Sequence, residues 1–280
     1  MVIDRLIDKI KEMDNPTVVG LDPQIDFVPK GMSVLEFNKK IIDAIYDIVP
    51  AVKLQIAFYE ALGVAGLEIY KHTIAYAKSK GLIVIADIKR GDIASSAQAY
   101  ANAHIGRAGD FCVDFATINP YMGGDTIKSW LDNCKAYDKG VFVLVKTSNT
   151  GSGDFQDLIV DDKPLYEVVA QRTAEWGADM AGSHGYSAVA AVVGATHPQQ
   201  LSDLRAKIPK TFFLVPGYGV QGGTSADIRH AFDKNGGGAI VNNSRGIITA
   251  HQNPKYKELS FDEAIRAATL AMREDLRGVL

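Results

Sequence analysis

The sequence is poor in cysteine, lacks a long apolar run and carries little net charge, and each shortage excludes a class of protein. Its two cysteines, Cys112 and Cys134, form neither a CxxC pair nor a disulfide framework, which suits a reducing compartment. The longest segment without Asp, Glu, Lys or Arg, 180–202, contains two histidines, a proline and two glutamines, so it is too polar to cross a bilayer. A net charge of −3 without a basic block argues against nucleic acid as a partner.

The composition and the N-terminal segment indicate a globular protein of the cytoplasm. Hydrophobic residues make up 47% of the chain and charged residues 22%, a balance that supports a packed core without a disulfide or a structural metal. Residues 1–16 mix acids and bases and contain no apolar core of the signal-peptide type. Length alone allows two domains, but no linker divides the chain, and we expect a single domain over residues 1–280.

Eight short apolar runs recur along the chain, with helical patterns between them. The runs are 17–22, 51–55, 82–89, 112–119, 140–147, 187–195, 211–217 and 238–244. Several are continuously apolar, which is typical of parallel strands covered on both faces. Eight alternating βα units predict an α/β fold, a single (β/α)8 TIM barrel, over the alternative of an open doubly wound sheet.

Two helix starts can be read from Ser-x-x-Glu capping boxes at Ser33 and Ser260. Apolar residues at spacings of three and four follow Ser33, and Pro50 is expected to end that helix. The longest segment without a clear pattern is 150–164, after the fifth strand.

Distinctive polar residues lie where the predicted strands end. In a barrel the carboxyl ends of all strands meet on one face, and active sites are built there. In an open sheet the same residues would spread along an edge, so their number favours the barrel. They are Asp22, Lys53, Asp87, Lys89, Asp92, Ser148, Gln221 and Arg245.

The first informative motif is DIKRGD at 87–92. Asp87 and Lys89 are two residues apart on a strand, so both side chains point to the same side, here the barrel interior. With Lys53 and Asp92 they could alternate two cations and two carboxylates in one small space. A structural ion-pair network or a turn is the alternative reading, and the position at the strand ends favours catalysis.

The second motif is PGYGVQGG at 216–223. It contains GxGxxG before a helix with Thr224 or Ser225 at its N-cap, so a dinucleotide-binding fold has to be considered. Two observations argue against that fold: the motif belongs to the seventh βα unit and not the first, and no acid follows the next strand to bind a ribose hydroxyl. We therefore predict a phosphate site made of the backbone N–H groups of this loop together with Arg245. A flexible lid turn is the alternative.

These residues resemble those of the orotidine 5′-phosphate decarboxylases, the family that catalyses the last step of UMP synthesis. The resemblance spans nearly the whole chain. Within the family, the chain is similar to the longer bacterial branch. The resemblance rests on six ordered motifs: GLDP at 20–23, VKLQ at 52–55, DIKRGDI at 87–93, KTSN at 146–149, VPGYGVQGG at 215–223 and NNSRGI at 242–247.

The resemblance implies roles for individual residues. Lys53, Asp87, Lys89 and Asp92 match the charged tetrad of the family, with Lys89 as the proton donor. The substrate-binding residues that it implies are Asp22 and Lys53 for the ribose, Ser148 for the pyrimidine, Gln221 and Arg245 for the phosphate, and Pro216, Ile93 and Ser96.

The resemblance also implies partners and cofactors. Family members are homodimers in which Asp92, Ile93 and Ser96 reach the neighbouring subunit's site, although the family commonly has Thr where this chain has Ser96. The expected substrate is orotidine 5′-phosphate and the product UMP, and the family uses no metal and no organic cofactor.

Three other functions fit parts of the pattern. A magnesium-dependent keto-sugar-phosphate decarboxylase would use Asp87 and Asp92 as metal ligands. A class I aldolase would form a Schiff base on Lys89 or Lys146. A non-catalytic nucleotide-binding protein would keep the glycine-rich loop and Arg245 but would not need the tetrad.

Overall fold

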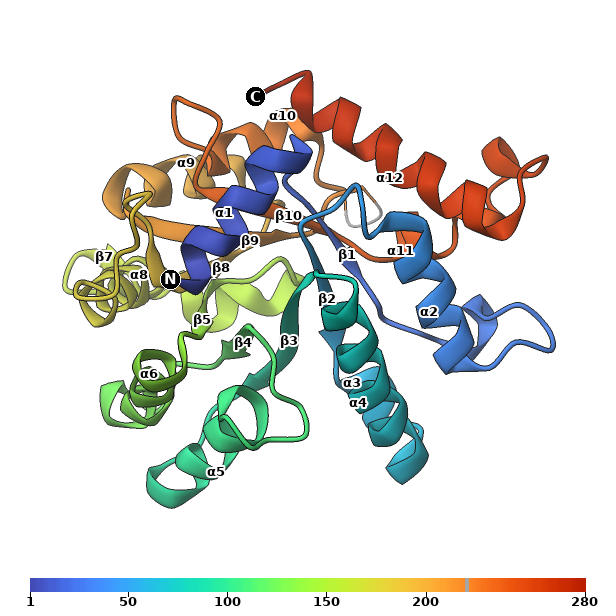
Figure 1. Cartoon of the computed structure of the whole chain (residues 1–280). Coiled ribbons are helices and arrows are strands. Elements are labelled where there is room, and N and C mark those ends of the chain that lie inside the picture. Colours follow the sequence, from blue (N-terminus) through green and yellow to red (C-terminus); the bar gives the residue numbers. More distant parts are fainter. Residues whose placement is uncertain (220–221) are drawn as a thin grey trace.

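The computed structural model describes residues 1–219 and 222–280 and contains a closed barrel of eight parallel strands (Figure 1). The strands follow one another around the barrel in chain order, and the last pairs with the first. They are β1 (Thr17–Gly20), β2 (Ala51–Gln55), β3 (Ile83–Arg90), β4 (Phe115–Ile118), β5 (Gly140–Lys146), β8 (Ser187–Val193), β9 (Thr211–Pro216) and β10 (Ala239–Asn243). The predicted TIM barrel is confirmed.

Helices surround the barrel, and Figure 1 shows them arranged around the strands at the centre. The α-helices are α1 (Val2–Met13), α2 (Val34–Ile45), α3 (Ala57–Glu60), α4 (Gly63–Ser79), α5 (Ala94–Ile105), α6 (Gly124–Tyr137), α7 (Gly153–Gln156), α8 (Leu165–Trp176), α9 (Pro198–Lys207), α10 (Ser225–Ile228), α11 (Arg245–Ile248) and α12 (Phe261–Arg277). Short 3-10 turns are η1 (Ile25–Phe27), η2 (Thr150–Ser152), η3 (Arg229–Ala231), η4 (Ala250–Gln252) and η5 (Pro254–Tyr256). No helix in the described ranges is both long and apolar enough to cross a membrane.

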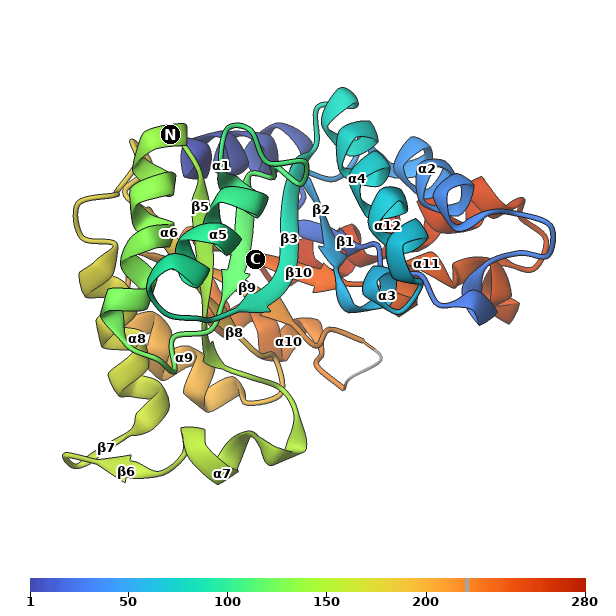
Figure 2. The same ribbon diagram turned by 90° about the horizontal axis from the view of Figure 1, so that it is seen from below.

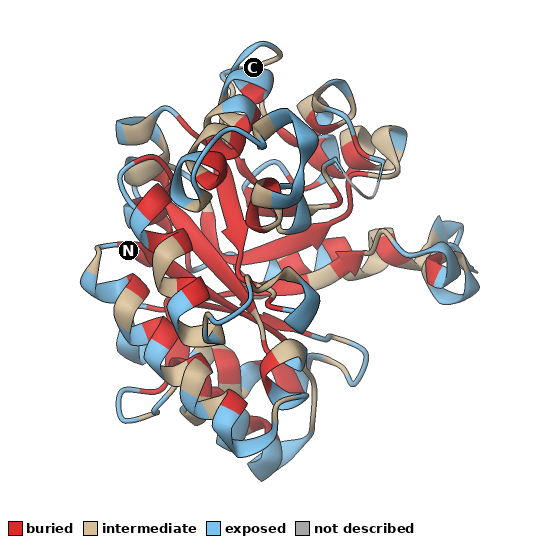
Figure 3. Ribbon diagram, turned by 90° about the vertical axis from the view of Figure 1, so that its right-hand side faces the viewer, coloured by how far each residue is buried: buried red, intermediate tan, exposed pale blue. Residues whose placement is uncertain are grey.

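The strands form the core because both of their faces are covered. All seven residues of β8 are buried, and so are all residues of β1, β4 and β10. Figure 3 shows the strands at the centre almost entirely buried, whereas the helices alternate buried and exposed residues. Continuous apolar runs therefore mark strands that contact side chains of the barrel interior on one face and helices on the other.

Some element boundaries differ from those that the sequence predicts. Strand β1 ends at Gly20, so Asp22 follows the strand instead of closing it. Helix α2 begins after its Ser33 cap but ends at Ile45, ahead of Pro50, which directly precedes β2. The segment 150–164 is not irregular: it contains η2, α7 and an antiparallel pair, β6 (Ile159–Val160) and β7 (Lys163–Pro164). In Figure 2, α7 and this pair lie beyond the carboxyl end of β5.

A buried histidine in α5 couples the stability of this fold to pH. His104 is 3% exposed and stacks on Phe111, with ring centroids 5.5 Å apart. Burial, aided by the positive charge of Arg90, lowers the pKa of His104 to about 4 from an ordinary value of 6.5. Between these two pH values the unfolded chain binds a proton at this position and the folded chain does not. Stability is therefore lost as the pH falls through this window.

We predict that His104→Phe removes part of this pH dependence. The wild-type protein should lose roughly 3 kcal/mol more unfolding free energy between pH 7 and pH 4 than the variant does, which corresponds to the pKa difference. Urea unfolding at both pH values measures it, and His72→Gln on the surface controls for the removal of a histidine. Equal losses in wild type and His104→Phe would contradict the prediction.

Candidate active site

A cavity of about 660 Å³ opens at the carboxyl ends of the barrel strands. Each of the eight strands, or the residues directly after it, contributes to its lining. The charged residues in the lining are Asp22, Lys53, Asp87, Lys89 and Arg245. The sequence prediction that polar strand ends meet on one face of the barrel holds for these five side chains.

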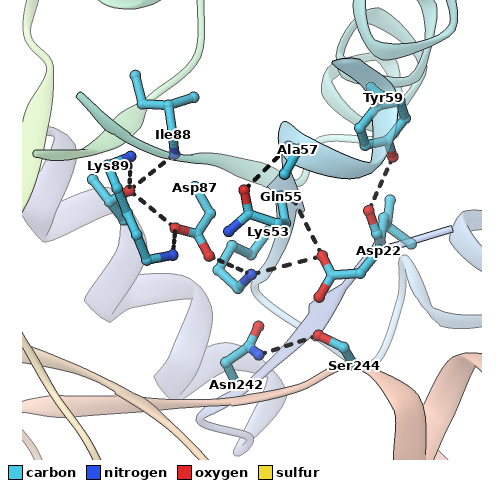
Figure 4. Close-up of polar contacts among 12 residues, drawn as sticks. Asp22, Lys53, Gln55, Ala57, Tyr59, Asp87, Ile88, Lys89, Asn242 and Ser244 are labelled. Atoms are coloured by element: carbon cyan, nitrogen blue, oxygen red, sulfur yellow. Dashed lines mark hydrogen bonds and ion pairs between the residues drawn. The ribbon is translucent and has the colours of Figure 1, made fainter. Parts of the chain in front are cut away.

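Four of these side chains form a row of alternating charge (Figure 4). The Lys53 Nζ atom lies 2.8 Å from Asp87 Oδ2 and 3.7 Å from Asp22 Oδ1. The Lys89 Nζ atom lies 2.6 Å from Asp87 Oδ1. Asp87 therefore stands between two ammonium groups and Lys53 between two carboxylates.

Strand pairing positions this row. Gly20 of β1 is in register with Lys53 of β2, and Gln55 of β2 is in register with Asp87 of β3. The backbone N–H of Gln55 also donates to Asp22 Oδ1 at 3.2 Å, which fixes the first carboxylate. Three adjacent strands thus present their charges at neighbouring heights on the same face of the barrel.

Burial and charge together decide the ionisation of the inner pair. Lys53 is 4% exposed and Asp87 is 7% exposed. Burial alone would lower the pKa of Lys53, but the carboxylates of Asp22 and Asp87 raise it above its ordinary value. Burial alone would raise the pKa of Asp87, but Lys53 and Lys89 hold it well below its ordinary value. Both groups are consequently charged at neutral pH.

The backbone at Lys89 departs from the regular strand that the sequence predicts. Lys89 has a φ of 47°, in the left-handed region that residues other than glycine rarely adopt. The register between β3 and β4 also shifts between Ala86 and Arg90. Lys89 and Asp87 therefore meet through an irregular backbone, and not through the simple alternation of a strand. The Lys89 side chain is 44% exposed, so its ammonium group faces the open cavity.

Three predicted residues lie outside the cavity lining of this chain. Asp92 Oδ1 accepts a hydrogen bond from the N–H of Ile93 at 2.7 Å, and Ile93 is 58% exposed. Ser96, near the start of α5, is exposed as well. Within this chain the second carboxylate beside Lys53 is Asp22, and the expectation that Asp92 reaches the neighbouring subunit's site stays a prediction.

The lining supplied by β5, β9, β10 and the residues directly after them contains the predicted pyrimidine and phosphate residues that the structure describes. Ser148, Pro216 and Arg245 line it, and Arg245 is the first residue of α11. Gln221 lies outside the described residues.

Three amides of the glycine-rich loop are bonded within the loop itself. The N–H groups of Gly219, Gly222 and Gly223 donate to carbonyl oxygens of Gly223, Gly219 and Gly217 respectively, at 2.8–3.0 Å. These three amides close the loop on itself, and the phosphate site predicted at this loop stays a prediction. Among the described residues, Arg245 is the charged group at this end of the cavity.

Two observations bear on the other functions considered from the sequence. Within the described part of the chain, no group of three or more His, Cys, Asp or Glu side chains could hold a metal ion. Lys146 is fully buried, is not part of the cavity lining and bonds Asp157 Oδ1 at 2.7 Å. Lys146 is therefore not placed to form a Schiff base with a ligand in the cavity.

One cavity residue that sequence reasoning missed is Thr117 of β4. Its Oγ1 atom donates to Asp87 Oδ1 at 3.0 Å. A threonine in a short apolar strand is ordinary in composition, so no local pattern distinguishes it.

Comparison with known proteins gives one consistent match. Residues 16–258 match the model of the orotidine 5′-phosphate decarboxylase / HUMPS family. A protein of Petrotoga mobilis named orotidine 5′-phosphate decarboxylase is 46% identical, over 99% of this chain and 99% of its own length. One of the same name from Clostridium perfringens is 43% identical, over 100% and 99%. The solved structure of OMP decarboxylase from Leishmania donovani has a TM-score of 0.81 at 32% identity and covers 99% of this chain and 98% of its own.

The buried ion pair predicts a large difference between the two lysines of the row. Replacing Lys53 by Met leaves the buried Asp87 and the partly buried Asp22 beside an apolar side chain, whereas Lys89→Met removes a half-exposed charge. We expect Lys53→Met to lower the unfolding free energy by about 3–5 kcal/mol and Lys89→Met to lower it much less. Urea unfolding at pH 7 measures both, and equal effects of the two substitutions would contradict the prediction.

Proposed function

The chain belongs to the orotidine 5′-phosphate decarboxylase / HUMPS family, and on that premise we propose that it decarboxylates orotidine 5′-phosphate to UMP without a metal or an organic cofactor. The observation that carries the proposal is the row Asp22–Lys53–Asp87–Lys89 in a cavity at the active end of the barrel. The row ends on a lysine ammonium that faces the open cavity. Such a group can donate a proton to a carbon that becomes negatively charged.

The difficulty of this reaction lies in the carbanion that it creates. Loss of CO2 breaks the bond between C6 of the pyrimidine and the carboxylate carbon, and the electron pair stays at C6 in the plane of the ring. The π system cannot delocalise a pair in that plane, and decarboxylases often use an organic cofactor as an electron sink. Here the Lys89 ammonium stabilises the developing charge and then transfers its proton to C6.

One ammonium group does not supply enough energy. At about 4 Å and an effective dielectric constant near 20, it contributes roughly 4 kcal/mol. Demanding reactions need up to about 23 kcal/mol for a 10¹⁷-fold acceleration. The remainder has to come from fixed geometry and from binding energy at parts of the substrate that do not react.

Asp87 contributes to catalysis in two ways. Its hydrogen bond to Lys89 orients the ammonium group before the substrate arrives, so little reorganisation is needed in the transition state. Because Asp87 stays ionised at neutral pH, it also disfavours a substrate carboxylate beside it, and this repulsion ends when CO2 leaves. Lys53 holds the Asp87 carboxylate from the other side.

The remaining cavity residues bind the nonreacting parts of the nucleotide. Arg245, together with Gln221, binds the phosphate, and Ser148 recognises the pyrimidine. Asp22 and Lys53 contact the ribose, and Pro216 contributes to the wall of the cavity. Phosphate binding far from C6 supplies energy that the reacting end uses to exclude water.

The carboxylates of the site support a reaction without metal. Asp87 is bonded to Lys53 and Lys89, and Asp22 to Lys53, so their negative charge is balanced by ammonium groups. A divalent cation at the same carboxylates would have to displace those lysines.

We also propose a cytoplasmic homodimer in which Asp92, Ile93 and Ser96 enter the partner subunit's site. This is supported by their position directly after β3, beside the cavity mouth, with Ile93 and Ser96 exposed and none of the three lining this chain's own cavity. The free thiols of Cys112 and Cys134 fit a reducing cytoplasm.

Lys89→Ala tests the assignment of the proton donor. We expect less than a tenth of the wild-type kcat, because both the charge opposite the carbanion and the proton are lost. The measurement is the absorbance change of orotidine 5′-phosphate, with UMP binding and the thermal midpoint as controls for the fold. A variant that keeps more than a tenth of the wild-type kcat would exclude Lys89 as the donor.

Mixed dimers test the contribution of Asp92 across the interface. Lys89→Ala and Asp92→Asn should each be nearly inactive alone. After subunit exchange, half of the dimers are mixed and half of their sites contain neither substitution, so about a quarter of the wild-type activity returns. If Asp92 acted in its own subunit, mixing would restore nothing.

A further inference from the structure

Thr117 occupies the point where the ladder between β3 and β4 is interrupted. Ala86 pairs with Ala116 and Arg90 pairs with Ile118, so residues 87–89 of β3 face the single residue Thr117 on β4. Such an irregularity leaves backbone groups of the longer strand without their usual partners. At 1% exposure, Thr117 is closed off from water that could replace those partners.

The hydroxyl group of Thr117 takes the place of the missing partners. Thr117 Oγ1 accepts hydrogen bonds from the N–H groups of Ile88 and Lys89, both at 2.9 Å, and donates to Asp87 Oδ1 at 3.0 Å. A hydroxyl group has one donor and two acceptor sites, so all three are occupied. The hydroxyl is thereby fixed in one orientation.

These bonds hold both Lys89 and Asp87, the two residues that the proposed reaction depends on. The bond to the Lys89 amide holds the residue whose φ is 47°, a conformation that persists only where its surroundings enforce it. The bond to Asp87 Oδ1 fixes the same carboxylate oxygen that binds Lys89 Nζ. Asp87 Oδ2 is left to Lys53.

We infer that Thr117 is a positioning residue, which sets the direction of the Lys89 ammonium group by holding the bulged backbone of β3 and the Asp87 carboxylate together. This inference rests on the proposed function for its catalytic consequence, but not for the geometry itself. Valine matches threonine in shape without the hydroxyl, and it would leave the N–H groups of Ile88 and Lys89 and one carboxylate oxygen without this partner. β3 would then relax toward a regular strand and shift Lys89.

The test compares Thr117→Val, Thr117→Ser and Thr173→Val. Thr173 is a matched control, because its buried hydroxyl bonds only the Val169 carbonyl within α8 among the contacts described. We expect Thr117→Val to lower kcat about 100-fold, as an ångström-scale displacement of a catalytic group does, while the Kd for UMP changes less than about threefold. Thr117→Ser and Thr173→Val should both stay within about fivefold of the wild-type kcat.

Amide hydrogen exchange supplies a readout that does not depend on activity. In Thr117→Val the N–H groups of Ile88 and Lys89 should exchange at least about tenfold faster than in wild type, and Thr117→Ser should restore their protection. If the valine variant does not fold, Thr117→Ala replaces it in both measurements.

The outcomes separate this inference from the proposed function. A wild-type protein that does not decarboxylate orotidine 5′-phosphate overturns the proposed function, and amide exchange then decides the role of Thr117 alone. An active wild type with an unchanged kcat in Thr117→Val overturns the inference about Thr117. Unchanged exchange at Ile88 and Lys89 overturns it too, as does a serine variant that rescues neither readout.

Discussion

A carboxylate buried at the end of a barrel strand needs positive charge close by, and Asp87 obtains it from two sides. Lys53 reaches it from the neighbouring strand β2, and Lys89 reaches it from β3 itself. The two lysines differ in surroundings, because Lys53 is buried and Lys89 is half exposed to the cavity. Asp87 therefore joins a fixed structural cation to one that can meet a ligand, and the arrangement of the whole site follows from that carboxylate.

The barrel makes this arrangement possible by keeping charge at one end. Its strands are lined by apolar residues over most of their length, so the charged groups of this site gather where the strands stop. Pairing registers between β1, β2 and β3 set the spacing of Asp22, Lys53 and Asp87. Positions fixed by backbone pairing change little when a ligand binds, which is what preorganised electrostatic stabilisation requires.

Sequence patterns predicted the barrel and much of the site, since apolar runs and polar strand ends are properties of neighbouring residues. They brought Lys53, Asp87 and Lys89 together at the cavity, although Lys53 and Asp87 lie within their strands and do not end them. They could not predict the bulge at Lys89, because it depends on a hydroxyl from another strand, Thr117. They did not show that Asp22 lies beside Lys53, since proximity along the chain does not reveal which carboxylate faces a buried lysine. Nor does the glycine pattern at 216–223 show that amide N–H groups of this loop donate to carbonyl oxygens of the same loop.

The most direct test of the proposed chemistry measures the wild-type protein with and without metal ions. The purified protein is treated with EDTA and dialysed, and the absorbance change of orotidine 5′-phosphate is followed before and after treatment. If charge fixed by Asp87, Lys53 and Lys89 carries the reaction, UMP forms at the same rate in both samples. Activity that disappears with EDTA and returns with Mg²⁺, or no formation of UMP in either sample, would contradict it.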